Sequence, residues 1–133
     1  MNEARIPVSL GELLDKITIL RIKAARISDA QQLGNVRVEL ALLEKIWNEL
    51  GAATAELNAE ERALQAVNER LWDIEDRIRD KEARQLFDRE FIELARAVYK
   101  TNDERAGIKR RVSTKLNSRL IEEKSYKPYA KAP

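Results

Sequence analysis

The chain has 133 residues, of which 44% are hydrophobic and 36% are charged, and 25 Lys and Arg residues against 23 Asp and Glu give a net charge of +2. It contains no Cys and no His, which excludes disulfides, thiolate nucleophiles, iron–sulfur clusters and imidazole chemistry. We therefore expect no catalytic residue, no metal site and no cofactor.

The length suits one ordinary domain, and the hydrophobic content can supply its core. Between Pro7 and Pro128 there is no proline to interrupt long helices. No apolar run reaches the length of a membrane span, and the N-terminus lacks a signal-peptide core. We expect a single helical-bundle domain over residues 1–133, cytoplasmic and without membrane insertion, in which residues 122–133 form an extended or frayed tail.

A first helix is predicted to begin at Ser9, which with Glu12 forms a capping box. Apolar residues then recur at helical intervals as far as Ile27. The lysines and arginines between them do not alternate as a strand would require. Isoleucines on a second side indicate that this helix is buried on two sides.

Two heptad seams follow in the chain. The first lies in a helix from about Asp29 to Leu50, and its members are Leu33, Val36, Leu40, Leu43, Trp47 and Leu50. The second lies in a helix from Asn58, capped with Glu61, to about Ala83, and its members are Leu64, Val67, Leu71, Ile74 and Ile78. The short connection at Gly51 predicts that these two helices pair as an antiparallel hairpin.

Asp88 is predicted to cap the next helix, whose apolar stripe begins at Phe91. Thr101 and Glu104 form another capping box, so either a fifth helix restarts there or one helix runs from about Asp88 to Leu120. The predicted fold class is all-α: an antiparallel bundle of four to five amphipathic helices with a central helical hairpin.

Polar residues interrupt the stripe of this last helix. Continuing it by threes and fours from Phe91 leads through Asn102 and Arg105 before apolar residues resume at Ile108. A buried arginine needs a carboxylate or an anionic ligand, whereas water-facing caps at a helix break would need neither. The candidate ligand site or polar network comprises Asn68, Trp72, Glu75, Arg79, Arg96, Tyr99, Asn102 and Arg105. We expect its last four members to face the bundle near Glu75 and Arg79.

From residue 100 onward the chain carries ten basic and four acidic side chains. A candidate anion-binding surface consists of Lys109, Arg110, Arg111, Lys115 and Arg119. Such a helix face raises nucleic-acid affinity in a salt-dependent and non-specific way. Because no helix-turn-helix, RNP or zinc pattern accompanies it, a solvated helix face explains it as well.

Three segments carry a resemblance: IPVSLGELLDKITILRIKAARI, VNERLWDIEDRIRD, and FIELARAVYKTNDERAGIKRR with the later EEKSY. Together they resemble a family of small, all-helical bacterial proteins known as a domain of unknown function. The resemblance covers nearly the whole chain and implies a bacterial, intracellular protein, with a loose association to genes for cell-surface polysaccharides. It implies no catalytic residue. It points to the polar residues named above, and to Asp76 and Asp103 beside them.

Three functions fit these patterns. The favoured one is a non-enzymatic helical interaction or oligomerisation module, acting as a homo-oligomer or with a protein partner, with Trp47 and Trp72 as candidates for a contact between chains. The alternative is a binder or enzyme that acts on a small anionic metabolite, such as a sugar phosphate, through an arginine and carboxylate site. Weak, non-specific nucleic-acid binding is a further and less favoured alternative.

Overall fold

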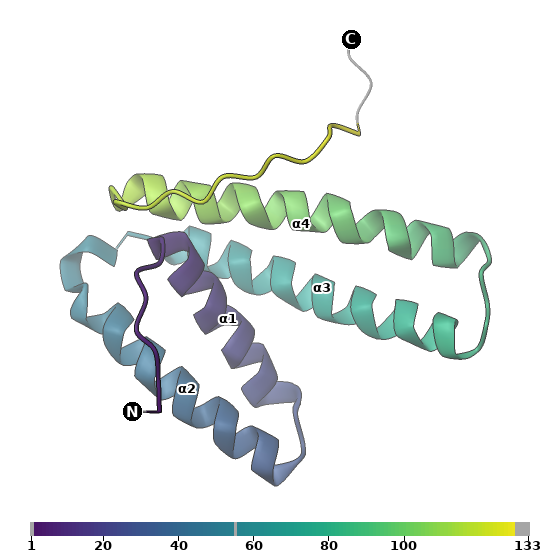
Figure 1. Ribbon diagram of the computed structural model, residues 1–133, viewed down its shortest axis with the longest axis horizontal. Coiled ribbons are helices and arrows are strands. Elements are labelled where there is room, and N and C mark those ends of the chain that lie inside the picture. The colour runs from purple at the N-terminus through teal and green to yellow at the C-terminus, as the bar shows by residue number, and fades with distance from the viewer. Residues whose placement is uncertain (1, 55, 130–133) are drawn as a thin grey trace.

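The computed structural model describes residues 2–54 and 56–129, and the regular structure of this part of the chain is entirely helical. Figure 1 shows its elements. These are α1 (Leu10–Arg26), α2 (Ala30–Glu49), the short 3-10 helix η1 (Gly51–Thr54), α3 (Asn58–Ala83) and α4 (Arg89–Lys115). The all-α fold class is confirmed. Among the helices described, none is long and apolar enough to cross a membrane.

The helices pair as α1 with α2 and as α3 with α4, and the two hairpins lie at an angle to each other (Figure 1). α1 also packs against both α3 and α4, whereas the described residues of α2 and α3 make no close backbone contact. The predicted hairpin of α2 with α3 is therefore wrong. A heptad seam shows that a helix has an apolar stripe but does not specify its partner. In this fold α1, which is buried on two sides, packs between α2 and the hairpin of α3 with α4.

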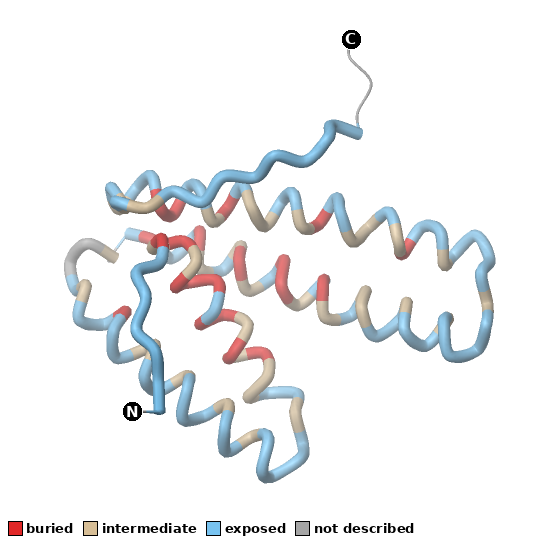
Figure 2. Tube along the Cα trace, viewed as in Figure 1, coloured by how far each residue is buried: buried red, intermediate tan, exposed pale blue. Residues whose placement is uncertain are grey.

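The core lies where the hairpins meet, and buried residues gather there in Figure 2. Its members are Leu13, Leu14, Ile17, Trp47, Leu57, Leu64, Val67, Ile108 and Val112. Trp47 is 6% exposed within this core, so the expectation that it contacts another chain is wrong. The far ends of both hairpins are largely exposed (Figure 2).

Two helices begin at the caps that the sequence predicts: the side chains of Ser9 and Asp88 accept hydrogen bonds from backbone N–H groups in the first turns of α1 and α4. Asp29, predicted only as the approximate start of the second helix, caps α2 in the same way. The predicted cap at Asn58 is wrong, because α3 begins at that residue and Leu57, its N-cap, makes no side-chain cap bond. Leu57 is 2% exposed in the core, so core packing sets where α3 begins.

α4 is one continuous helix through Thr101, which decides between the two alternatives for this segment. Thr101 is buried and lies seven residues from both Leu94 and Ile108, which are buried as well. A spacing of seven places all three on the face that α4 packs against its neighbours. Tertiary packing thus overrides the local capping signal at Thr101 and Glu104.

After α4 the chain turns at Asn117, where φ is 52°, and then returns in an extended conformation along α4 (Figure 1). We call residues 119–129 the C-terminal strap. Residues 122–129 of the predicted tail belong to it, and residues 130–133 lie outside the described part of the chain. The Ser118 hydroxyl accepts a hydrogen bond from the N–H of Leu10 at 3.1 Å, which fixes the start of the strap to α1.

Candidate functional site

A buried polar network joins α1 to α3. Asp15, Thr18 and Asn68 are each at most 4% exposed. The Asn68 amide Nδ2 donates to Asp15 Oδ1 at 2.8 Å and to Thr18 Oγ1 at 3.0 Å, and the Thr18 hydroxyl donates to the Asp15 carbonyl at 2.8 Å. These bonds fix the orientation of the Asn68 amide and leave its oxygen to accept from a third element.

Arg105 of α4 supplies that third contact. Its Nη1 group donates to Asn68 Oδ1 at 3.3 Å. Arg105 is half-buried, and no carboxylate in the described residues lies within salt-bridge distance of its guanidinium. A neutral amide thus positions the guanidinium, and no carboxylate of the described chain offsets its charge directly.

Lys109, one turn further along α4, is surrounded by carboxylates, in contrast to Arg105. Its Nζ atom lies 2.6 Å from Glu12 Oε2, 3.3 Å from Glu122 Oε2 and 3.8 Å from Asp15 Oδ2. Burial alone would lower the pKa of Lys109, but the bond to Glu12 and the charges of Asp15, Glu12 and Glu122 raise it above its ordinary value. Lys109 therefore stays charged and holds α1, α4 and the strap together.

Two clefts share Arg105, Lys109 and Lys124 as lining residues. The first, which we call the tyrosine cleft, has a volume of about 560 Å³ and lies between α4 and the strap. The second, which we call the carboxylate cleft, has a volume of about 420 Å³ and is also lined by Glu12, Asp15, Glu39 and Glu122. Both fall in the size range of small-molecule sites.

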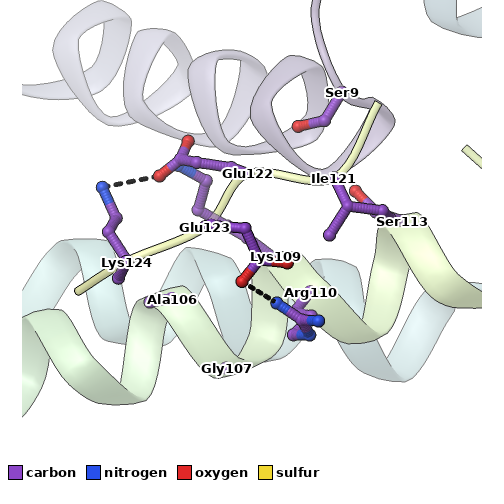
Figure 3. Close-up of a pocket in the computed structure, with 10 residues that line it drawn as sticks. All are labelled: Ser9, Ala106, Gly107, Lys109, Arg110, Ser113, Ile121, Glu122, Glu123 and Lys124. Carbon is purple, nitrogen blue, oxygen red and sulfur yellow. Dashed lines mark hydrogen bonds and ion pairs between the residues drawn. The ribbon is translucent and has the colours of Figure 1, made fainter. Parts of the chain in front are cut away.

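A third, smaller pocket of about 190 Å³ lies beside the N-terminal end of α1 (Figure 3). Figure 3 shows the strap held to α4 there by the ion pair of Arg110 with Glu123, at 3.0 Å. The Ser113 hydroxyl accepts from the N–H of Gly11 at 2.9 Å. Because serine side chains already accept from the first N–H groups of α1, this helix end does not offer them to an anion.

The structure brings together only part of the predicted polar site. Asn68 contacts Arg105, and Tyr99 and Asn102 line the tyrosine cleft with Arg105. Arg96 is exposed and lies 3.5 Å from Glu93. The hydrogen bond with Tyr99, followed by the charge of Glu93, raises the pKa of Arg96.

The other predicted members lie elsewhere on α3. Glu75 and Arg79 form an ordinary i,i+4 ion pair at 3.3 Å, and Arg79 is exposed. Trp72 is half-buried beneath the Arg26 guanidinium, 5.7 Å from its ring centroid. The expectation that Arg96, Tyr99, Asn102 and Arg105 would all face the bundle near Glu75 and Arg79 is therefore wrong. Arg96 and Tyr99 are exposed, and Arg105 contacts Asn68.

Carboxylates compensate much of the predicted basic surface. Besides Lys109, Arg110 pairs with Glu123, and Lys115 pairs with the buried carboxylate of Glu60. The hydrogen bond from Lys115 holds the pKa of Glu60 below its usual range. Arg111 and Arg119 are exposed. The five residues thus do not act as one uncompensated face.

Sequence reasoning missed the α1 part of the network, and it predicted an extended or frayed tail without predicting that this tail packs along α4. Asp15 and Thr18 lie three residues apart, and Thr18 interrupts the apolar run Ile17–Leu20, which is the available signal for them. Tyr126 and Tyr129 give no signal of their own, because an extended segment has no period that predicts where it packs.

The fold and the site together define a class of all-helical protein in which two angled hairpins enclose a buried polar network beside two clefts. This chain belongs to the family of unknown function DUF6165, whose family model matches residues 4–133. The match confirms the resemblance to an uncharacterised family over nearly the whole chain. No curated protein and no solved structure matches the chain at a significant level.

Proposed function

We propose that the protein binds a small anionic metabolite, such as a sugar phosphate or another phosphate ester, with Arg105 as its anchor. The observation that carries this proposal is the environment of Arg105. Its guanidinium donates to the neutral Asn68 amide, has no carboxylate within salt-bridge distance among the described residues, and lines the tyrosine cleft, in which Asp103 is the single carboxylate of the lining.

The energetics favour an anion at this place. A guanidinium that is partly removed from water and lacks a counter-charge costs free energy, and a bound phosphate or carboxylate offsets that cost. The planar guanidinium can also donate two parallel hydrogen bonds to such a group. Asn68 is itself fixed by Asp15 and Thr18, so the receptor is organised before the ligand arrives.

The experiment is isothermal titration calorimetry with glucose 6-phosphate and, separately, inorganic pyrophosphate as probes. We expect Arg105→Met to weaken binding by about ten- to a hundredfold, since a hydrogen bond to a charged group contributes about 1.5–3 kcal/mol. The free variant should lose about 1–2 kcal/mol of stability, because the change leaves only one neutral acceptor, Asn68 Oδ1, without its hydrogen bond.

Arg111→Met is the matched control, because it removes the same charge from an exposed position of the same helix that lines neither cleft. It should bind both probes like the wild type. Absence of binding by both probes, or equal losses for Arg105→Met and Arg111→Met, would contradict the proposal.

We infer a second property, self-association through α2, from a different observation. Trp47 is the one buried residue of this helix, whereas Val38, Leu42 and Ile46 are 65%, 52% and 48% exposed. A spacing of four places these three side chains in one outward stripe. The stripe is symmetric about Leu42, so that an antiparallel second copy would set Val38 against Ile46 and Leu42 against its own counterpart. Such self-complementarity is what a two-fold interface needs.

Sedimentation equilibrium at micromolar concentration should therefore give twice the chain mass of 15.3 kDa for the wild type. Leu42→Lys should give the single-chain mass, because a charge at the centre of the stripe cannot be paired there. Ile92→Lys, which adds the same charge at a residue 50% exposed on α4, should stay dimeric. A wild type of single-chain mass, or a dimer that tolerates Leu42→Lys, would exclude this interface.

A further inference from the structure

The tyrosine cleft gathers all of the tyrosines in the sequence. The chain has three, and Tyr99, Tyr126 and Tyr129 each line this cleft. Tyr99 lies on α4 and the other two lie on the strap, so only the tertiary structure brings them together. Since aromatic residues make up only 5% of the chain, this gathering is a distinctive feature of the cleft.

The rings are accessible to a ligand. The exposed fractions of Tyr99, Tyr126 and Tyr129 are 42%, 75% and 55%. The ring centroids of Tyr99 and Tyr129 are 5.0 Å apart, and the two ring planes are tilted by 57° relative to each other. Partial desolvation, followed by the charge of Asp103, raises the pKa of Tyr129. Exposed aromatic rings in a cleft are suited to stacking against another ring.

The rings are carried by a segment that ion pairs hold in place. Glu122 lies 3.3 Å from Lys109 of α4, and Glu123 lies 3.0 Å from Arg110 of α4; the second pair is drawn in Figure 3. The strap is thereby fixed to α4 three residues before Tyr126. Tyr126 and Tyr129 line the cleft from the strap, and the ring of Tyr129 meets that of Tyr99 on α4, so part of the cost of ordering the strap is met before a ligand binds.

The remaining lining is cationic. Arg105, Lys109, Lys124 and Lys127 oppose a single carboxylate, Asp103, in the lining of this cleft. Lys109 and Lys124 have carboxylate partners, whereas Arg105 has none within salt-bridge distance in the described residues. The cleft therefore combines an anion anchor with aromatic faces in one volume of about 560 Å³.

We propose that the tyrosine cleft binds a phosphate ester that carries a planar ring, with the phosphate at Arg105 and the ring against Tyr99, Tyr126 and Tyr129. This inference rests on the proposed function, in which Arg105 binds an anion. It adds the chemical class of the ligand: the ring is either an aryl group or a nucleobase, and both offer the same stacking face.

The test is a titration of the full chain followed through its amide resonances by NMR, with methyl phosphate, phenyl phosphate, adenosine 5′-monophosphate and adenosine as probes. We expect the two ring-bearing phosphates to bind at least about tenfold tighter than methyl phosphate, because stacking on an aromatic side chain adds to the binding free energy. Adenosine, which lacks the phosphate, should bind more weakly than its monophosphate. Whichever of phenyl phosphate and adenosine 5′-monophosphate binds more tightly carries the type of ring, aryl group or nucleobase, that the cleft prefers.

Substitutions in the cleft separate the contribution of the ring to binding from the contribution of the phosphate. Tyr126→Leu should reduce the affinity for phenyl phosphate toward that for methyl phosphate and leave methyl phosphate binding unchanged. Arg105→Met should weaken both. Phe87→Leu, at a ring 54% exposed outside the cleft, is the control and should change neither.

The outcomes distinguish the two proposals. If methyl phosphate binds through Arg105 but neither phenyl phosphate nor adenosine 5′-monophosphate binds tighter, or if Tyr126→Leu and Tyr99→Leu both bind the two ring-bearing phosphates like the wild type, the ring inference is overturned and the anion site stands. If none of the three phosphates binds, the anion site fails and the ring inference fails with it.

Discussion

Gly11→Ala is expected to destabilise the protein by about 3 kcal/mol. Gly11 lies in the first turn of α1, where a Cβ atom would meet the backbone carbonyl oxygen of Lys109 in α4 at a separation that Cβ atoms do not show. It would also crowd the Ser113 hydroxyl, which accepts the hydrogen bond from the Gly11 N–H. Because the obstacle is backbone rather than a flexible side chain, α1 and α4 must separate.

Urea unfolding followed by circular dichroism measures this change. Gly34→Ala is the matched control: a Cβ atom at Gly34 meets nothing within 4 Å, and the residue lies inside α2. It should stabilise the protein by about 0.5–1 kcal/mol, since alanine favours a helix over glycine. A Gly11→Ala protein as stable as the wild type would show that α1 and α4 do not approach as closely as described.

Asn68→Leu is expected to lower the free energy of unfolding by a similar amount, about 3 kcal/mol. Leucine has the same branched shape and the same number of side-chain heavy atoms as asparagine, but its methyl groups can neither donate nor accept, so the change chiefly removes hydrogen bonds. Asp15 loses the bond to Oδ1 while its carboxylate stays buried, with Lys109 3.8 Å away as its remaining charged neighbour. Thr18 and Arg105 each lose a partner as well. A buried group left without its hydrogen bond bears the full cost of its desolvation.

Asn48→Leu is the control, because Asn48 has the same side chain at an exposed position on α2. It should unfold within about 0.5 kcal/mol of the wild type. The comparison with Arg105→Met is also informative. The loss of Asn68 should destabilise the free protein more than the loss of Arg105, because only the first change leaves a buried carboxylate without its partner. Equal losses for the two variants would indicate a closed structural network in place of an anion receptor.

Part of the candidate site could be predicted from the sequence. The stripe of α4 led to Asn102 and Arg105, because a helical period places residues on a face, and Asn68 was also among the predicted members of the site. Arg96, one further predicted member, could not be excluded from the sequence, because only the neighbouring elements decide which arginine is covered. Arg105 meets Asn68 of α3, whereas Arg96 lies on an exposed part of α4.

The sequence by itself determined the local features of this protein. Helices begin at Ser9, Asp29 and Asp88 because a side-chain oxygen and a backbone N–H only a few residues apart suffice to form each cap. The absence of Cys and His likewise removed whole classes of chemistry before any fold was known.

Only the tertiary structure decided the features that depend on distant contacts. The pairing of α1 with α2, the continuity of α4 through Thr101 and the burial of Asp15 follow from which apolar faces meet. Many pairings bury similar apolar area, and a period along one helix carries no information about its partner. The contact of Tyr99 with Tyr129 also depends on the tertiary structure, because an extended strap acquires its position only from the helix along which it packs.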